Sequence, residues 1–169
     1  MRYFTSDTHY GHQNIIRFCD RPYIDVHHMN VDLVNRAAGM VNAGDELWHL
    51  GDVALGYLND TLTNTTLTLS NGVDVKVSHF PYTDPQLDGR EDRHGKVIGD
   101  KFAPWRAVDD GSWLLCGHVH DSWRQRGRMI NVGVDSWGGN PVGEDAIIEL
   151  IEAGPRDLPP LPWDVGGHV

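Results

Sequence analysis

Residues 1–12 read MRYFTSDTHYGH, and residues 46–53 read ELWHLGDV. In each stretch, a short run of β-forming residues ends close to an acidic side chain, Asp7 in the first and Asp52 in the second. Between them, residues 25–41 carry apolar side chains at helical spacing. A strand, helix, strand order of this kind predicts a parallel pair of strands in an α/β fold.

The rest of the chain predicts more short strands. They are expected at residues 65–69, 73–78, 113–116 and 129–134. Asn71-Gly72 suits a tight hairpin turn between the first two of these strands. Asn14 and Asp25 are the expected caps of a short and a longer helix. Residues 146–151 predict a last strand or a single helical turn.

The composition favours one folded domain. With 169 residues, of which 40% are hydrophobic, the chain can bury a core of its own. We expect the domain to cover residues 1–152. Residues 153–169 contain several prolines that exclude regular secondary structure, so we expect a solvated tail there.

Charge and cysteine content narrow the class of protein. A net charge of −10 excludes strong attraction to duplex nucleic acid and to anionic membranes. Residues 1–12 do not resemble an export signal, and no stretch approaches the ~20 apolar residues of a membrane helix. Cys19 and Cys116 lack the spacing of a disulfide framework, which favours buried thiols in a reducing compartment. We therefore expect a cytoplasmic protein.

Residue types that bind metal ions recur where the expected strands end. They are Asp7, His9, Asp52, His79, His118 and His120. In α/β sheets, side chains at the carboxyl ends of strands meet in one crevice even when they are distant in sequence. The i, i+2 spacing of the first two and of the last two would place both members of an extended pair on one side.

The chemistry of this residue set points to a pair of divalent ions. Carboxylates mixed with imidazoles suit Mn, Fe, Ni or Zn and are poor for Ca, which prefers oxygen ligands alone. A carboxylate such as Asp52 can bridge two ions, one oxygen to each. Two ions held in this way polarise a phosphoryl group for in-line displacement, so the residues predict hydrolysis of a phosphate ester.

Four motifs in this order resemble the calcineurin-like metallophosphoesterase superfamily and, more narrowly, a small bacterial and phage branch of it. They are Asp7-Thr8-His9, Gly51-Asp52-Val53, Ser78-His79-Phe80-Pro81 and Gly117-His118-Val119-His120. The resemblance covers about residues 1–145 and implies an α/β sandwich of two sheets flanked by helices.

The resemblance also implies the roles of the ligands and the reaction. The first metal would be bound by Asp7, His9, Asp52 and His120, and the second by Asp52, His79 and His118. The two ions would be Mn²⁺, with Fe, Ni or Zn as alternatives. The implied reaction is attack of a metal-bound hydroxide on a small phosphomonoester or phosphodiester, and cyclic nucleotides are among the implied substrates.

One motif of that superfamily, G-N-H-D/E, has no counterpart between Asp52 and His79, so we expect a fold shortened in the middle. In the superfamily this motif supplies an Asn ligand to the second metal and a His that assists the leaving group. Asn59 or Asp60 is a candidate replacement for the ligand, and His12 for the acid.

The absence of this motif keeps a second hypothesis open, in which the protein binds metal or nucleotide with impaired or no catalysis. It also predicts a homodimer, if a second copy covers a sheet edge or apolar face that the missing segment leaves open.

Arginines near the motifs are candidates for binding substrate phosphate, because a guanidinium matches phosphate oxygens in a fork. Arg17 and Arg21 follow the first motif closely, and Arg124 follows the last. The alternative for each is ordinary surface charge. His49 precedes Asp52 on its expected strand and is interpreted as a core histidine or one that supports the ligands.

Overall fold

The computed structural model describes residues 1–54, 64–82, 99–100 and 102–163. Its elements, in chain order, are β1 (Arg2–Thr5), α1 (Gln13–Phe18), α2 (Val26–Met40), β2 (Glu46–His49), β3 (Thr65–Thr68), β4 (Asp74–Val77), the 3-10 helix η1 (Ala103–Trp105), β5 (Trp113–Cys116), β6 (Gln125–Arg126), β7 (Met129–Asn131), the 3-10 helix η2 (Val134–Ser136), β8 (Val142–Gly143) and α3 (Glu144–Glu152).

The strands form two mixed sheets. The smaller sheet has the order β2-β1-β8, and the larger has the order β3-β4-β5-β7-β6. β1 pairs with β2 in parallel, which confirms the strand, helix, strand unit predicted from the first fifty residues. β3 and β4 form the predicted antiparallel hairpin, and β4, β5 and β7 are parallel to one another. Parallel strands place their carboxyl ends at one edge, where the motifs follow.

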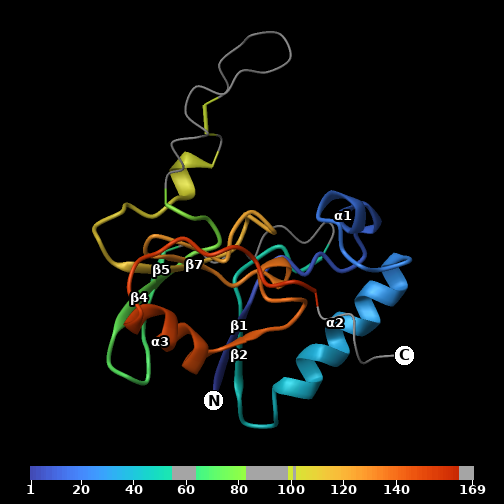
Figure 1. The fold of residues 1–169 in the computed structure, drawn as a ribbon, viewed down its shortest axis with the longest axis horizontal. Coiled ribbons are helices and arrows are strands. Elements are labelled where there is room, and N and C mark those ends of the chain that lie inside the picture. Colours follow the sequence, from blue (N-terminus) through green and yellow to red (C-terminus); the bar gives the residue numbers. More distant parts are fainter. Residues whose placement is uncertain (55–63, 83–98, 101, 164–169) are drawn as a thin grey trace.

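The two sheets and α3 share one hydrophobic core. Phe4 of β1, Val77 of β4, Leu115 of β5 and Ile147 of α3 belong to this cluster and are almost completely buried. A second cluster joins α1 and α2 around Met29. Figure 1 shows α2 and α3 on opposite sides of β1 and β2. The coarse prediction of an α/β fold is therefore confirmed.

Helix ends follow local capping rules in α2 but not in α1. Asp25 caps α2 as predicted, because its side chain accepts a hydrogen bond from the backbone N–H of His28. α1 begins one residue before Asn14, so His12 occupies the N-cap position and the prediction for Asn14 is wrong. His12 makes no side-chain capping bond, which means that packing positions this six-residue helix.

Two predictions near the end of the chain are decided by the structure: the helical alternative holds for residues 146–151, and the strand predicted at residues 129–134 is shorter. Residues 146–151 lie within α3, a nine-residue helix whose apolar side pairs Ile147 with Leu150 in the core. The strand predicted at residues 129–134 ends at Asn131, and the chain then turns through η2. In both cases a short run of apolar residues fitted the spacing of a strand and also that of a helix, and tertiary packing decided which of the two formed.

The segment after α3 packs against the domain, which corrects the expectation of a solvated tail for its described part. Leu158 exchanges backbone hydrogen bonds with Gln125, and the backbone N–H of Leu161 donates to Ser136. The ring of Trp163 lies 5.5 Å from the ring of Tyr23 in an edge-to-face contact. Irregular backbone is therefore held here by bonds to the sheet and by aromatic packing.

The cysteine prediction is confirmed in its structural part, since Cys19 and Cys116 are both buried and free. Among the helices that the structure describes, none has the length and apolar character needed to cross a bilayer.

Candidate metal centre

Loops that follow four strands lie side by side and carry the predicted ligands. The loop after β1 runs beside the loop after β2, because the backbone N–H of Asp7 donates to Gly51 at 3.0 Å and that of His9 donates to Asp52 at 2.9 Å. The loop after β5 joins the end of β4 through a bond from Gly117 to His79. Backbone pairing thus continues past the strand ends and brings the four motifs together.

Five of the six predicted ligands form a continuous chain in which carboxylates alternate with imidazoles. Asp52 Oδ2 lies 3.6 Å from Nε2 of His9 and 3.6 Å from Nε2 of His79. Asp7 Oδ1 lies 4.0 Å from Nε2 of His79 and 4.0 Å from Nε2 of His120. Two groups of three ligand atoms result, and Asp7 is common to both: Asp7, His9, His120 and Asp7, Asp52, His79.

These distances fit ligands that share an ion better than they fit hydrogen bonds. Each separation exceeds the usual N–H···O distance of about 2.9 Å. Ligands that sit about 2.1 Å from one ion lie roughly 3 to 4 Å from one another. The Nε2 atom of His9 is buried and has no hydrogen-bond partner in residues 1–54, 64–82, 99–100 and 102–163. An imidazole nitrogen left without a partner beside two carboxylates is what a divalent cation would satisfy, so the residues present fit the implied metal.

The ligands sit on strained backbone. Positive φ angles between 46° and 71° occur at Asp7, His9, Asp52, His118 and His120. Left-handed conformations are uncommon outside glycine, and where they cluster they mark functional sites. This corrects the expectation that paired ligands converge because they lie on extended chain. Left-handed turns, and not strand alternation, direct these side chains into the centre.

Glycines next to the ligands allow the loops to approach closely. A Cβ on Gly51, whose φ is +144°, would lie 2.7 Å from Nδ1 of His79. A Cβ on Gly117 would collide with Ser6 Oγ and Asp7 Oδ2. The glycines before Asp52 and His118 are therefore required by packing around the centre as well as by turn geometry.

Asp135 is a residue of the centre to which the sequence analysis assigned no role. Its Oδ2 lies 2.9 Å from Nδ1 of His120. Burial opposes charge on this ring, but the bonds to Asp135 and Cys19 and the negative charge of Asp7 together outweigh burial and raise the pKa of His120 to about 11. A carboxylate bonded to one ring nitrogen orients the other toward a metal. The sequence offered one signal for Asp135: an acidic residue that closely follows an expected strand, as Asp7 and Asp52 do.

Arg21 stabilises the candidate centre through buried hydrogen bonds, so its side chain is not available to bind a substrate. Its Nε and Nη2 donate to the two carboxylate oxygens of Asp135, each at 2.8 Å, and both side chains are fully buried. Its guanidinium also donates to the backbone carbonyls of Thr8 and Asp7. Every nitrogen of the fork has a protein acceptor, which corrects both the expected phosphate contact and the surface-charge alternative.

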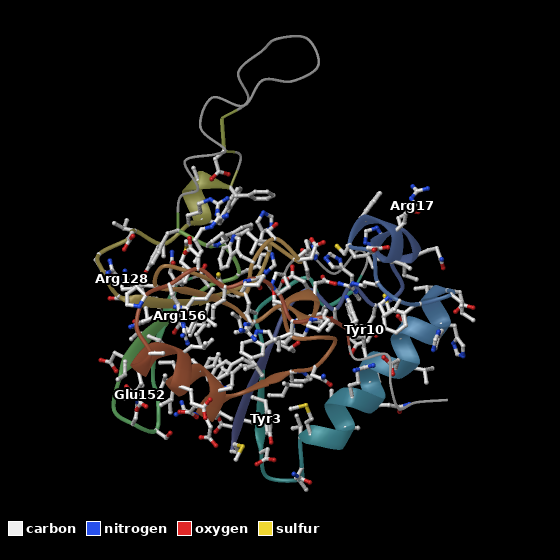
Figure 2. The ribbon with its side chains drawn as sticks, viewed as in Figure 1. Tyr3, Tyr10, Arg17, Arg128, Glu152 and Arg156 are labelled. Carbon is white, nitrogen blue, oxygen red and sulfur yellow. The ribbon has the colours of Figure 1, made fainter. Side chains whose placement is uncertain are left out.

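Arg17 and Arg124 occupy different surroundings. Figure 2 shows Arg17 at the outer end of α1, where its side chain points away from the sheets. Its guanidinium carbon lies 5.8 Å from the ring centre of Phe18. The guanidinium of Arg124 packs over the ring of Trp137, at 5.3 Å. Neither arginine side chain extends to the row of carboxylate and imidazole side chains in the candidate centre.

His118 lies beside the centre but outside both ligand groups. Its ring centre is 5.4 Å from that of His79, and it packs against the rings of Phe80 and Phe102. Burial, together with the nearby His79, lowers the pKa of His118 to about 4, so the ring is neutral near pH 7. Its backbone N–H donates to both carboxylate oxygens of Asp7. The main chain of His118 thus orients one ligand.

Two further histidines flank the centre. The ring of His12 lies 5.4 Å from the ring of His9, and its Nδ1 is buried without a partner. His49 supports the first motif, as one interpretation expected: Nδ1 accepts from the backbone of Gly51, and Nε2 bonds the hydroxyl of Thr8. Asn59 and Asp60, the candidate replacement ligands, lie outside the described residues.

A cavity of about 500 Å³ opens next to the centre. It is lined by Ile15, Phe18, Cys19, Pro81, Arg106, His118, Val119, His120, Asp121 and Ser122. His118 and His120 connect it to the carboxylate and imidazole chain. The arrangement therefore combines a cluster of metal-binding residue types with an adjoining space large enough for an organic group.

The fold and the centre define an α/β protein with two mixed sheets and a cluster of carboxylates and imidazoles where the strands end. No family model matches the sequence. The uncharacterized protein MJ1445 of Methanocaldococcus jannaschii is 30% identical, and the match covers 90% of this chain and 92% of that protein. The chain belongs to the family of this archaeal protein.

Two further comparisons are consistent with that placement. The gene 66 protein of Mycobacterium phage L5 is 27% identical, with 88% of this chain and 93% of the phage protein covered. A solved structure, the protein of unknown function AQ665 from Aquifex aeolicus, matches with a TM-score of 0.62 at 20% identity. The match covers 89% of this chain and 98% of the Aquifex chain, so the two share a fold.

Proposed function

We propose that the protein is a metal-dependent phosphoesterase of the calcineurin-like metallophosphoesterase type. The observation that carries this proposal is the alternating chain of His9, Asp52, His79, Asp7 and His120, with neighbouring atoms 3.6 to 4.0 Å apart. Metal-binding residue types are common on protein surfaces. A fully buried carboxylate, Asp7, and a partly buried one, Asp52, interleaved with three imidazoles are not, because such groups are costly to bury without cations to share them.

The proposed centre holds two ions, and the grouping of the ligand atoms supports this division. His9 and His120 belong with Asp7 to one ligand group, and His79 belongs with Asp7 and Asp52 to the other. Asp7 is common to both groups, and Asp52 Oδ2 lies 3.6 Å from Nε2 of His9 in one group and from Nε2 of His79 in the other, which supports the proposed place of Asp52 between the two ions. Mn²⁺ suits this ligand set, and Fe, Ni or Zn are alternatives. Divalent ions bound there would supply Lewis acidity toward a phosphoryl oxygen.

His12 is the proposed proton donor to the leaving group. Its ring lies next to His9, and its buried Nδ1 has no acceptor or donor among the residues that the structure describes. A group in this position can hold a proton at the edge of the centre without binding the ions itself. Replacing His12 with Ala should lower kcat, and the loss should be smaller for substrates whose leaving group needs no proton.

The substrate is proposed to be a small phosphomonoester or phosphodiester. The net charge of −10 opposes binding of long duplexes, while local cations would attract one phosphate. We place the activity in the cytoplasm, where the free thiols of Cys19 and Cys116 would persist.

Hydrolysis of bis(p-nitrophenyl) phosphate tests the proposal. We expect turnover that requires added Mn²⁺ and falls at least a hundredfold in Asp52→Asn. Asp20→Asn, which changes an exposed carboxylate, serves as the matched control and should keep the rate of the parent protein. Calorimetry with Mn²⁺ separates the rival function. Tight binding without turnover would support a metal-binding protein that lacks catalysis, and absence of binding would remove both.

A further inference from the structure

The cavity beside the centre is larger than a phosphate group requires. Its volume is about 500 Å³, within the range of pockets that hold organic ligands. Ile15, Phe18 and Cys19 of the α1 segment form one part of its lining, and Pro81 and Arg106 form another. His118 and His120 connect it to the centre. A phosphate held at the centre would therefore carry any attached group into a partly apolar space.

Phe18 presents an exposed aromatic ring to this cavity. The residue is 64% exposed, whereas Phe4 and Phe80 are 0% and 8% exposed. It ends α1, and its ring also contacts the edge of the His12 ring. A large apolar ring left in water costs free energy that core packing would recover. At the mouth of a cavity, such a ring is a stacking platform for a flat ligand.

Arg106 adds a site for negative charge in the same cavity. Its Nε bonds Asp100 and its Nη1 donates to the backbone carbonyl of Pro81. Within the described part of the chain, Nη2 has no hydrogen-bond partner, although the side chain is more than nine-tenths buried. Buried guanidinium nitrogens are normally satisfied. An anionic oxygen of a ligand would complete this set of donors.

We propose that the cavity binds a nucleotide, with the base stacked on Phe18 and the phosphate directed toward His118 and His120. This proposal deepens the proposed function, because it names the substrate class of the same centre. An aromatic platform, an unsatisfied guanidinium donor and adjacent metal ligands together match a flat base joined to a phosphate through a sugar. A phosphosugar or phospholipid headgroup would leave the ring of Phe18 without a stacking partner.

Calorimetric binding of adenosine monophosphate and of ribose 5-phosphate, both with Mn²⁺, tests this assignment. The two probes share a sugar and a phosphate and differ in the base. We expect the adenosine probe to bind about tenfold or more tightly than ribose 5-phosphate, because stacking on an aromatic side chain provides that difference. Phe18→Ala should remove most of the difference and leave ribose 5-phosphate binding unchanged.

Two further variants test whether the preference depends on the aromatic ring of Phe18. Phe18→Trp keeps an aromatic face and should retain the preference for adenosine monophosphate. Ile24→Ala removes an apolar side chain that is 85% exposed and does not line the cavity, so it should behave as the parent protein. Equal affinity for the two probes, or a preference that survives Phe18→Ala, would overturn the nucleotide assignment.

The outcome is independent of the proposed catalysis. Nucleotide binding that depends on Phe18, in a protein that does not hydrolyse bis(p-nitrophenyl) phosphate, would support the cavity assignment and reject the phosphoesterase. Hydrolysis by a protein that binds adenosine monophosphate no better than ribose 5-phosphate would keep the phosphoesterase and reject the nucleotide.

Discussion

Asp135 and His120 form a directed pair: Oδ2 of the carboxylate lies 2.9 Å from Nδ1 of the ring, and Nε2 of the same ring faces Asp7 Oδ1 at 4.0 Å. The carboxylate therefore determines which nitrogen of His120 is available to a cation. Arg21 holds the other side of Asp135. A buried arginine, a buried carboxylate and a ligand imidazole form one support for the centre, and it is the part most open to mutational test.

Asp135→Asn should weaken Mn²⁺ binding by about ten- to a hundredfold, because the amide removes the negative charge that orients and polarises His120. Calorimetry at a temperature where circular dichroism shows the variant to be folded measures the effect. Asp20→Asn is the control of equal chemistry on the surface. An unchanged affinity in Asp135→Asn would show that His120 is not a ligand held by this carboxylate.

Arg21→Met should lower the free energy of unfolding by about 3–5 kcal/mol, because it leaves the carboxylate of Asp135 buried without its ion-pair partner. Arg17→Met changes an exposed guanidinium at the end of α1 and should stay within about 0.5 kcal/mol of the parent protein. Urea unfolding followed by fluorescence compares them. Equal stabilities would contradict the structural role assigned to Arg21.

Gly51→Ala and Gly39→Ala should have opposite effects on stability. At Gly51 the added Cβ meets the ring of His79 on backbone with φ of +144°, so we expect a loss of roughly 1–3 kcal/mol and weaker Mn²⁺ binding. At Gly39, within α2, nothing lies within 4 Å of the new Cβ, and alanine should stabilise the helix by about 0.5–1 kcal/mol. The two urea midpoints should move apart around that of the parent protein.

His49 should make the fold more sensitive to acid. Burial lowers the pKa of His49 to about 4, below its ordinary value near 6.5, and its Nδ1 is already an acceptor for the N–H of Gly51. A depressed histidine pKa gives a contribution to stability that is complete above about pH 6.5 and is lost as the pH falls toward 4. Because asparagine does not titrate, the stability difference between the parent protein and His49→Asn should shrink by about 1–3 kcal/mol over this range. Urea unfolding at pH 7 and at pH 4.5 measures this, and a constant difference would refute it.

Much of the fold was predictable because the signals are local. The β1–β2 pair, the β3–β4 hairpin and the Asp25 cap follow from neighbouring residues. The ambiguities fell on short apolar runs. Residues 146–151 satisfied both a strand and a helix until Ile147 and Leu150 were placed together in the core.

The sequence predicted which residues form the candidate centre but not how the backbone brings them together. Five of the six proposed ligands lie together, and His118 lies beside them. Their convergence depends on left-handed backbone at residues such as Asp7 and Asp52, which no periodic pattern indicates. Strand alternation predicted that Asp7 pairs with His9 and His118 with His120, and the structure groups the first pair but leaves His118 outside.

The amino-acid sequence by itself determined where the strands end and which metal-binding side chains follow them, because both depend on residues close together in the chain. Only the tertiary structure determined which other side chains contact and orient these residues. Arg21 and Asp135 are 114 positions apart, and neither residue's neighbours indicate the pairing. Similarly, Phe18 at the end of α1 and Arg106 after η1 line one cavity although they are far apart in the sequence. Long-range packing brings charged groups and exposed rings together, and a pattern of neighbouring residues does not indicate which distant residues meet.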